Sequence, residues 1–543
     1  MPTLNWIGKE KVVNHHLEVP YKVLKHRYGY RADNIQDKSF TGSGNMIIHG
    51  DNLEALKSLL PEYEGKIKCI YIDPPYNTGN EGWVYNDNVK HPKIQKWLGE
   101  VVGKQNEDFT RHDKWLCMMY PRLKLLQRLL SEDGAIFISI DDNEYANLKL
   151  ICDEVLGANN FIGNITIVGN PGGRDYGGIA RMHDYLLVYG CRETILNLIE
   201  DKERQFKMFD SFGGFELREL RNRNVRFNKE NRPNLYYPFY IDENSVDENG
   251  LCEISLTPND RFSRELFPAK SQGIDTVWRW GKVKSNENIN VNIKAKPMKN
   301  GSFMIVEKYR ENRVRARSVW WNEDINTQKG TLLLKDIFGT KKFDYPKPVR
   351  MLELIIEMST DEKSIILDSF AGSGTTAHAV LNLNKKDGGN RKFILVEMED
   401  YADTITAERV RKVMSGYSDS EGTGGSFDYY ELGETLFNAD GMLNENVGED
   451  CIREYVYYTE TKQYLNRKRD NLNRYLLDTW NGVGYYLYYE RNKETALTYD
   501  TLNIMGEKAE SYIVYADTCT IDNDYLTENN IIFRKIPRNI KKI

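Results

Sequence analysis

The stretch Asp368-Ser369-Phe370-Ala371-Gly372-Ser373-Gly374-Thr375-Thr376 decides the fold of this 543-residue chain. It lies between an apolar, strand-like segment, Ser364–Leu367, and a helical pattern that runs through Leu383. Glycines at such a turn let a ligand approach the backbone, although a tight turn without a ligand uses them as well. Glu397 ends the next apolar segment at about the distance expected for a carboxylate on ribose hydroxyls; the alternative is an exposed acid at a strand end. The pattern predicts a doubly wound α/β sheet with a nucleotide-like ligand at this turn.

A second motif, Asp73-Pro74-Pro75-Tyr76, closes the apolar segment Ile67–Ile72. The Asp73 carboxylate and the Pro74 carbonyl can both accept hydrogen bonds from a planar amine, and Tyr76 offers a ring on which a base stacks for about 1–3 kcal/mol. Such a pocket cannot reach a base inside a duplex, so the base must be flipped out. The alternative is a proline-rich turn in which Asp73 serves as a cap. The position at the end of an apolar strand, where doubly wound sheets bind ligands, favours group transfer to a nucleobase nitrogen.

Seven apolar segments are candidate strands of one sheet, and a long stretch without α/β alternation separates them into two groups. The candidates are Asn45–His49, Ile67–Ile72, Ala135–Ile140, Phe161–Val168, Tyr185–Tyr189, Ser364–Leu367 and Phe393–Val396. One doubly wound sheet interrupted by an inserted domain is the simplest arrangement. The expected parts are an N-terminal extension (1–40), a first half of the sheet (41–190), an insert (191–339), a second half (340–418) and a mixed C-terminal domain (419–543).

Charge is distributed unevenly along the chain, whose net charge is −6. Residues 261–320 hold 14 Lys and Arg against 5 Asp and Glu, whereas residues 419–454 hold 10 acidic residues and one Arg. A phosphate backbone responds to the local patch rather than to the sum, although a solvated surface face is the alternative. If residues 313–317 form a strand, Arg313, Arg315 and Arg317 share one face and are candidates for DNA contacts. The acidic stretch is expected to be a subunit contact or a solvated surface.

The seven cysteines are widely spaced and form no CxxC pair, so we expect neither a disulfide framework nor a structural zinc site. No other metal-ligand cluster is apparent, and no metal is expected. No run of about 18 apolar residues occurs, so no membrane span is expected either. The composition therefore predicts a cytoplasmic globular protein.

These motifs together resemble the β-class amino-methyltransferases of DNA, in which the catalytic motif precedes the target-recognition insert and the cofactor motif follows it. Within that family the chain is most similar to the modification subunit of Type III restriction–modification systems. The resemblance covers residues 40–190 and 335–435 well. The matching stretches are His49 to Leu56, Tyr71 to Asn80, Ile138 to Glu144, His183 to Tyr189, Phe343 to Pro348 and Asp368 to Thr376.

The resemblance implies a Rossmann-like sheet that binds S-adenosylmethionine and transfers its methyl group to N6 of a flipped-out adenine in double-stranded DNA. Asp73, Pro74, Pro75 and Tyr76 would then be catalytic, and the acidic first letter of this motif favours adenine over cytosine. The implied cofactor-binding residues are Asp51, near the cofactor's adenine, together with Asp368, Phe370, Gly372, Gly374, Thr375 and, on the ribose, Glu397.

The resemblance also implies a homodimer that can recruit an ATP-dependent restriction subunit. No helicase P-loop and no convincing nuclease motif is found in this sequence, so DNA cleavage would need that partner. A stand-alone methyltransferase without a nuclease partner remains an alternative. A nicotinamide-dependent oxidoreductase would explain only the glycine turn and Glu397, and a DNA-binding module without catalysis would leave the two intact motifs without a use.

Overall fold

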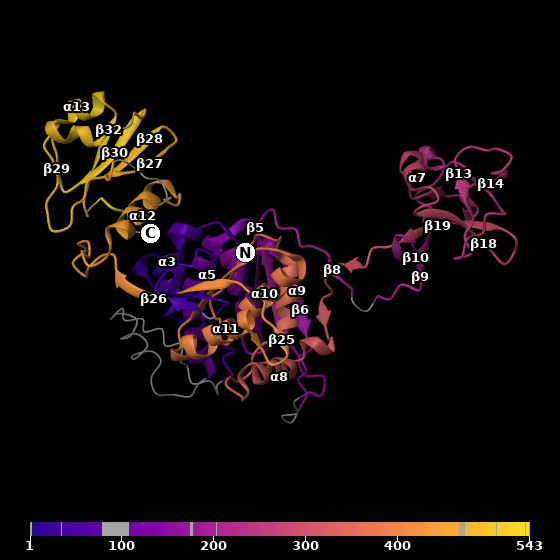
Figure 1. Ribbon diagram of the computed structural model, residues 1–543, viewed down its shortest axis with the longest axis horizontal. Coiled ribbons are helices and arrows are strands. Elements are labelled where there is room, and N and C mark those ends of the chain that lie inside the picture. The colour runs from indigo at the N-terminus through magenta and orange to yellow at the C-terminus, as the bar shows by residue number, and fades with distance from the viewer. Residues whose placement is uncertain are drawn as a thin grey trace. The chain divides into compact units, whose positions relative to one another are not determined.

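The computed structural model describes residues 3–33, 35–78, 108–173, 178–201, 204–465, 473–506, 508–537 and 539–541. The chain forms two compact units (Figure 1). Unit 1 combines Met1–Asn197 with Ala316–Ile543, and unit 2 is the continuous segment Leu198–Arg315. In the part of the chain that the structure describes, no helix is both long enough and apolar enough to cross a membrane.

Unit 1 is built on an eleven-stranded sheet in the order β2-β1-β26-β3-β23-β22-β4-β5-β7-β6-β21. In that order the strands are β2 (Ile35–Asp37), β1 (Lys22–Arg31), β26 (Ser426–Thr435), β3 (Met46–His49), β23 (Lys392–Glu397), β22 (Ile365–Asp368), β4 (Ile67–Ile72), β5 (Leu130–Ile140), β7 (Asp184–Gly190), β6 (Phe161–Ile167) and β21 (Val319–Trp320). The strands from β26 to β5 run parallel to one another, and β7 is antiparallel to both β5 and β6. All seven predicted strands lie in this sheet, which confirms the doubly wound α/β class.

The topology explains how two motifs far apart in the sequence meet. β22 pairs directly with β4, so that Ile366 lies opposite Cys69 and Leu367 opposite Ile70. Both strands are parallel, and the residues that follow them, Asp73 and Asp368 onward, therefore emerge at the same edge of the sheet. From this pair of strands the connections run in opposite directions along the sheet: β22 leads through α10 to β23 on one side, and β4 leads through α5 to β5 on the other.

Helices cover the sheet in two groups. The helices of unit 1 are α1 (Lys9–Val12), α2 (His15–Glu18), α3 (Asn52–Tyr63), α5 (Asp108–Leu129), α6 (Tyr145–Cys152), α8 (Thr327–Phe338), α9 (Val349–Ser359), α10 (Thr375–Asp387), α11 (Glu408–Ser415), α12 (Glu449–Thr461) and α13 (Asn523–Glu528). Helix α3 packs on α5, whereas α10 packs on α9 and α11. The crossovers through α3 and α10 run in opposite directions along the sheet, so right-handed connections place these two helices on opposite faces.

The central strands are buried on both faces, which is why they read as continuous apolar runs. Ile47 and Ile48 in β3, Ile70 in β4 and Ile394 and Leu395 in β23 are all fully buried. Four further strands, β1, β2, β21 and β26, were not expected in the sheet. β1 comes from the predicted N-terminal extension and β26 from the predicted C-terminal domain, and the two pair with each other antiparallel.

Unit 2 is narrower than the predicted insert, 191–339. Residues 316–339 belong to unit 1, because β21 pairs with β6 and α8 contacts α11. Unit 2 has its own core, which includes Leu220, Tyr237, Phe239 and Trp278. Its four-stranded sheet consists of β18 (Ile293–Pro297), β19 (Phe303–Tyr309), β10 (Gly213–Glu219) and β9 (Met208–Asp210), and its three-stranded sheet of β13 (Ile254–Ser255), β12 (Phe239–Ile241) and β14 (Arg264–Leu266). Three strand pairs lie outside these sheets: β11 (Arg221–Asn222) with β17 (Val277–Trp278), β15 (Lys270–Ser271) with β16 (Ile274–Asp275), and β8 (Ile199–Glu200) with β20 (Arg313–Val314). The described helix of this unit is α7 (Lys282–Asn288).

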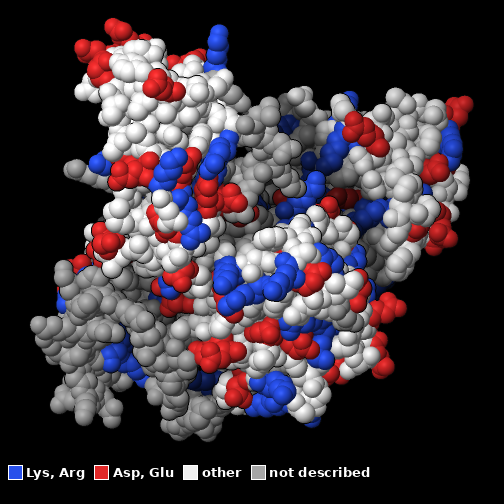
Figure 2. All heavy atoms as spheres, turned by 60° about the vertical axis from the view of Figure 1, so that its left-hand side comes forward, with Lys and Arg blue, Asp and Glu red and all other residues white. Residues whose placement is uncertain are grey.

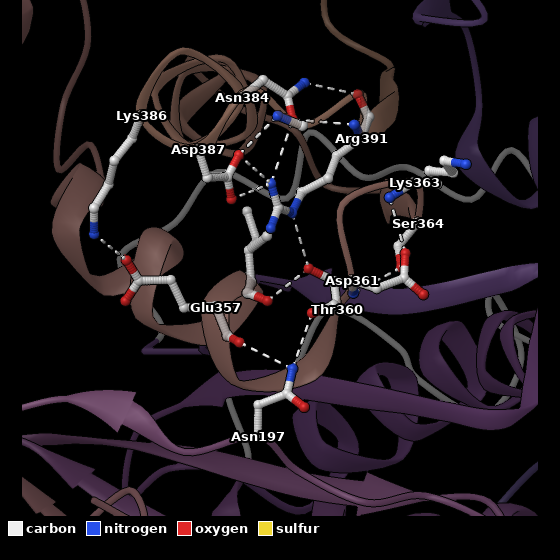
Figure 3. A network of polar contacts seen from close by, with 12 residues as sticks. Asn197, Glu357, Thr360, Asp361, Lys363, Ser364, Asn384, Lys386, Asp387 and Arg391 are labelled. Carbon is white, nitrogen blue, oxygen red and sulfur yellow. Dashed lines mark hydrogen bonds and ion pairs between the residues drawn. The ribbon is translucent and has the colours of Figure 1, made fainter. Parts of the chain in front are cut away.

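The chain leaves unit 1 from a fixed point (Figure 3). The side-chain amide of Asn197 donates hydrogen bonds to the carbonyl oxygens of Glu357 (3.2 Å) and Thr360 (2.9 Å), at the end of α9. The Arg391 guanidinium reaches the same corner, where it donates to the Thr360 hydroxyl and pairs with Asp387. The carbonyls at the end of α9, which lack partners within the helix, are therefore satisfied by the segment that leads to unit 2.

The C-terminal part of unit 1 adds a small second sheet. Its strands, in order, are β27 (Leu476–Trp480), β28 (Val483–Leu487), β30 (Ser511–Ala516) and β32 (Ile531–Lys535). Two strand pairs lie outside both sheets: β24 (Gly416–Tyr417) pairs with β25 (Ser420–Glu421), and β29 (Ala496–Leu497) pairs with β31 (Thr518–Cys519). Helix α12 joins this sheet to the larger one, since the Tyr458 hydroxyl donates to Glu64 at the end of α3 and accepts from Arg128 of α5.

Candidate active site at the carboxyl ends of β4 and β22

The two sequence motifs line one cleft of about 980 Å³ in unit 1. Asp73 to Tyr76 form one wall, after β4, and Asp368 to Thr376 form another, after β22. Residues 343–347 and 181–184 also contribute to the lining. The volume is at the upper end of the range typical of small-molecule sites, about 300–1,000 Å³. The cleft has room for a nucleoside-sized ligand and for a second planar group beside it.

The Asp73 carboxylate lies at the centre of the first wall. Its Oδ2 accepts a hydrogen bond from the Lys347 ammonium, while Oδ1 is buried and accepts no hydrogen bond from any residue that the structure describes. The same ammonium lies 5.1 Å from the centre of the Tyr76 ring. Burial, followed by the charge of Asp73, raises the pKa of Tyr76 well above its usual value, so the phenol stays neutral. A carboxylate with one open acceptor thus faces the cleft beside a neutral aromatic ring.

The two prolines differ in what their carbonyl groups do. The indole N–H of Trp115, fully buried in α5, donates to the Pro75 carbonyl at 2.7 Å. Among the described residues none donates to the Pro74 carbonyl, which leaves that oxygen for a ligand amine. The α5 helix therefore fixes the loop through one carbonyl and leaves its neighbour open.

A buried polar cluster supports this loop from behind. Asn77 has a left-handed backbone (φ 58°), which asparagine tolerates better than most residues, and its side-chain amide donates to Glu144. The fully buried Glu144 carboxylate also accepts from Asn147 at 2.8 Å and lies 2.6 Å from Nδ1 of His112. Gly79 and Asn80, which the family resemblance included, lie outside the described residues.

The glycine turn is held in shape by side chains around it. Gly372 (φ 52°) and Gly374 (φ 78°) both adopt left-handed conformations. The Gly372 N–H donates to Glu397 Oε2 at 2.7 Å, and the Gly372 carbonyl accepts from the Thr406 hydroxyl at 2.6 Å. The fully buried Arg409 donates to the side chains of Ser373 (2.9 Å) and Thr375 (2.8 Å). The turn is therefore shaped before any ligand binds.

Two buried carboxyl groups near the turn titrate close to neutral pH. Asp368 accepts from the Phe370 N–H (3.0 Å) and from the Thr376 hydroxyl (2.5 Å), and burial raises its pKa to about 7. Burial likewise raises the pKa of Glu397 to about 7. A cationic ligand in the cleft would favour the ionised form of both groups.

Three predicted cofactor residues, Asp51, Glu397 and Gly374, do not line the cleft. Asp51 caps α3, where its carboxylate accepts from the N–H groups of Leu53 and Glu54, and it lies 3.7 Å from Arg122. Glu397 is only 1% exposed and uses its oxygens on Gly372 and Glu399 N–H groups. Phe370, Gly372 and Thr375 line the cleft as expected, whereas Gly374 lies just behind them, against Thr406.

Several residues of the cleft were not singled out from the sequence. Glu399 and Tyr401 line it two and four residues beyond Glu397, and Phe343 packs edge-on against Tyr401 with ring centres 5.5 Å apart. Lys347 and Phe343 belong to a stretch that the resemblance marked without giving it a role. Among the described residues no group of three or more His, Cys, Asp and Glu side chains is arranged to hold a metal ion.

The three arginines proposed for DNA contacts do not share one strand. Only Arg313 lies in a strand, β20, and its guanidinium pairs with Glu311 at 2.9 Å. Arg315 and Arg317 are exposed in irregular backbone, on either side of the boundary between the two units. The condition under which the three would share a face is therefore not met.

Basic residues of the insert are largely paired. Unit 2 contains 22 Lys and Arg against 18 Asp and Glu, so the excess of residues 261–320 is reduced by acids from elsewhere in the same unit. Representative pairs are Arg261 with Asp242 and Glu253, Arg279 with Glu307, and Arg310 with Asp210. Figure 2 likewise shows Lys and Arg interspersed with Asp and Glu over the face it draws.

Adjacent parallel strand ends, a shaped glycine turn and an acidic, aromatic pocket thus lie in one cleft of an α/β sheet. The chain matches the family described as DNA methylase over residues 67–408, and it belongs to that family.

Three curated relatives are similar over most of this chain. The chain is 34% identical to the Type III restriction-modification enzyme EcoPI Mod subunit of Escherichia phage P1, over 73% of this chain and 64% of that protein. It is 34% identical to the Type II methyltransferase M.KpnI of Klebsiella pneumoniae, over 69% and 85%. It is 31% identical to the EcoP15I Mod subunit of Escherichia coli, over 73% and 64%. The chain thus spans somewhat less than two thirds of the two Mod subunits.

Proposed function

We propose that this protein transfers a methyl group from S-adenosylmethionine to N6 of an adenine flipped out of double-stranded DNA. The observation that carries the proposal is the shared cleft: the amine-binding motif after β4 and the glycine turn after β22 face one cavity. Membership in the DNA methylase family supports the reaction class. The choice of adenine rests on the acidic residue, Asp73, at the head of the motif.

The residues of the first wall suit an aromatic amine. Asp73 Oδ1 and the Pro74 carbonyl are the two open acceptors for its N–H groups. Hydrogen bonds to both draw the nitrogen out of conjugation with the ring, and the carboxylate balances the positive charge that develops on it. The Tyr76 ring provides the stacking surface. The phenol does not act as an acid or base at neutral pH, because its pKa is raised.

The residues of the second wall suit S-adenosylmethionine, which supplies a methyl group on a positively charged sulfur. The left-handed Gly372 allows close approach to the backbone, and the buried Asp368 offers negative charge to a cationic ligand. Because Glu397 is engaged with Gly372, we assign the ribose hydroxyls to Glu399, which lines the cleft and has a buried Oε1 without a hydrogen bond to any described residue. Glu399→Gln should weaken cofactor binding, and unchanged binding would return that role to Glu397.

The remaining roles follow from the similarity to Mod subunits. Unit 2 is proposed to recognise the target sequence. Arg313, Arg315 and Arg317 are proposed as separate DNA contacts, because all three side chains are exposed although they do not share a face. A homodimer that pairs with an ATP-dependent restriction subunit is proposed from the same similarity. All seven cysteines are free thiols, which supports a reducing, cytoplasmic location.

Labelled methyl transfer tests the proposal. The protein is incubated with tritium-labelled S-adenosylmethionine and unmodified plasmid DNA, and the DNA is digested to nucleosides. Label in N6-methyl-2′-deoxyadenosine supports the proposal, whereas label only in a methylated deoxycytidine, or only in an RNA acceptor, contradicts it.

A stand-alone methyltransferase is the second candidate, because M.KpnI, a Type II methyltransferase, is as similar as the EcoPI Mod subunit. Purification of the tagged protein from its own cells separates the two. Co-purification of a large ATPase supports the Type III assignment, and its absence favours the stand-alone enzyme.

A further inference from the structure

Lys347 contacts both groups that would hold the target base. Its ammonium donates to Asp73 Oδ2 and lies 5.1 Å from the centre of the Tyr76 ring. The side chains of Lys347 and Asp73 are only 17% and 25% exposed, so the pair is well shielded from water. An ammonium and an aromatic amine both present N–H donors. In this structure the lysine ammonium therefore occupies the space over the Tyr76 ring in which a base would stack.

The backbone of Lys347 is fixed although its side chain is long. Pro346 and Pro348 flank it, and each proline restricts its own φ. The segment also packs directly on α8: a Cβ on Gly330 would lie 2.2 Å from the Pro346 carbonyl oxygen and 3.0 Å from that of Lys347. The ammonium can thus swing away from Asp73 while its point of attachment stays in place at the cleft wall.

Other acidic side chains lie close to Asp73. The carboxyl groups of Asp184, at the start of β7, and Asp368, at the end of β22, interact electrostatically with Asp73, and burial raises the pKa of both; Asp141 lies beyond Asp184. Tyr71 and Tyr76, the titratable neighbours on the same strand and loop, are neutral.

The other cations of the cleft lining lie elsewhere. Arg181 is directed to Asp142 at 3.8 Å, and the His183 ring is directed to the Tyr185 hydroxyl at 3.0 Å. Lys347 is accordingly the cation of the described cleft that contacts Asp73.

We propose that Lys347 is a displaceable counter-ion: it holds the Asp73 carboxylate in position while the pocket is empty, and its ammonium leaves the face of the Tyr76 ring when the base enters. This inference rests on the proposed function. Lys347 is a positioning residue, since it acts on the reaction through Asp73. It competes with the base for the pocket and also keeps the acceptor ready for it.

Removal of the charge therefore has two opposing effects. Without Lys347 the base meets no competitor, so the KM for DNA stays equal or falls. Without the ammonium, however, Asp73 loses the hydrogen bond that holds its carboxylate in position. The single-turnover rate of methyl transfer should therefore fall about tenfold, the equivalent of about 1.4 kcal/mol on the barrier.

The experiment measures the single-turnover rate of methyl transfer to unmodified plasmid DNA and the KM for DNA, both at saturating S-adenosylmethionine. Lys347→Met and Lys347→Gln remove the charge, Lys347→Arg retains it, and Lys342→Met is the matched control, because Lys342 is exposed in the same segment. Thermal melting and cofactor binding confirm that each variant folds. The neutral variants should lose about tenfold in rate without a rise in the KM for DNA, and the Arg variant and the control should follow the wild type.

The outcomes separate this inference from the proposed function. If the wild type transfers no methyl group to DNA, the proposed function fails. If the wild type is active and the neutral variants keep its rate, or if their KM for DNA rises, the counter-ion role is wrong. A loss of rate in Lys347→Arg as large as in Lys347→Met also overturns it, because the charge would then not be the cause.

Discussion

Replacement of Gly374 by alanine tests whether the close packing behind the glycine turn shapes the site. At Gly374 (φ +78°) an added Cβ would lie 3.1 Å from the Thr406 carbonyl oxygen, which is backbone and cannot swing aside. Gly388, at the end of the same helix, is a matched control: its φ is +73°, and a Cβ there would meet nothing within 4 Å. Both variants carry the same backbone strain, about 1–2 kcal/mol.

The two variants should differ by the cost of the contact with Thr406. Overpacking of this kind costs about 1–3 kcal/mol, so Gly374→Ala should lose about 2–5 kcal/mol of stability and Gly388→Ala only about 1–2. Movement of Thr406 also disturbs its hydrogen bond to the Gly372 carbonyl, at the cleft wall. The affinity for S-adenosylmethionine should therefore fall about tenfold, the equivalent of about 1.4 kcal/mol, in Gly374→Ala alone.

Urea unfolding followed by circular dichroism gives the stability difference, and isothermal titration calorimetry gives the cofactor affinity. Equal losses of stability in the two variants would show that only the backbone conformation matters. Unchanged cofactor affinity in a destabilised Gly374→Ala would refute the argument that the packing of this turn shapes the cofactor site.

Three further changes have definite expected results. Because the folded protein holds a proton on Asp368 up to about pH 7 while the unfolded chain releases it near pH 4, this group makes the free energy of unfolding fall as the pH rises through that window. Asp368→Asn should flatten that slope in urea titrations, and a slope equal to that of the wild type would rule out the assignment. Replacing Arg313, Arg315 and Arg317 by Ala should weaken DNA binding at all sequences and lower the salt dependence by about 0.9 per lost phosphate contact, measured by fluorescence anisotropy; an unchanged salt slope counts against phosphate contacts. Trp115→Phe leaves the Pro75 carbonyl without its donor, a cost of about 1–3 kcal/mol, and should lower turnover about tenfold or more while cofactor affinity stays the same; a parallel loss of affinity would show a general disturbance of the fold.

The sequence was sufficient to predict the centre of the sheet. Strands such as β4 and β23 are buried on both faces, so they read as continuous apolar runs, and the motifs at their ends mark the ligand-binding edge. β1 and β26 were missed for the opposite reason. Both contain many polar residues, as expected of strands near an edge, and their pairing depends on contacts between the two ends of the chain.

The sequence predicted which residues lie near the site better than it predicted where their side chains point. Asp73 and Asp368 could be placed because each directly follows a strand. The ion pair of Lys347 with Asp73 joins residues 274 positions apart, and no local pattern indicates it. Glu397 has the expected position, but the Gly372 N–H draws its carboxylate away from the cleft wall. Such outcomes depend on hydrogen bonds within the turn, which the spacing of motifs does not specify.

The central claim is that Asp73 serves the chemistry at a cleft whose cofactor wall is a separate structure. The most direct test is the single-turnover rate of methyl transfer to adenine N6 by the wild type and Asp73→Ala, at saturating cofactor and DNA, together with the Kd for S-adenosylmethionine. The rate should fall by about 10²–10³, as for removal of one charge-stabilising group, while the Kd changes by less than about twofold. A rate close to that of the wild type would contradict the account.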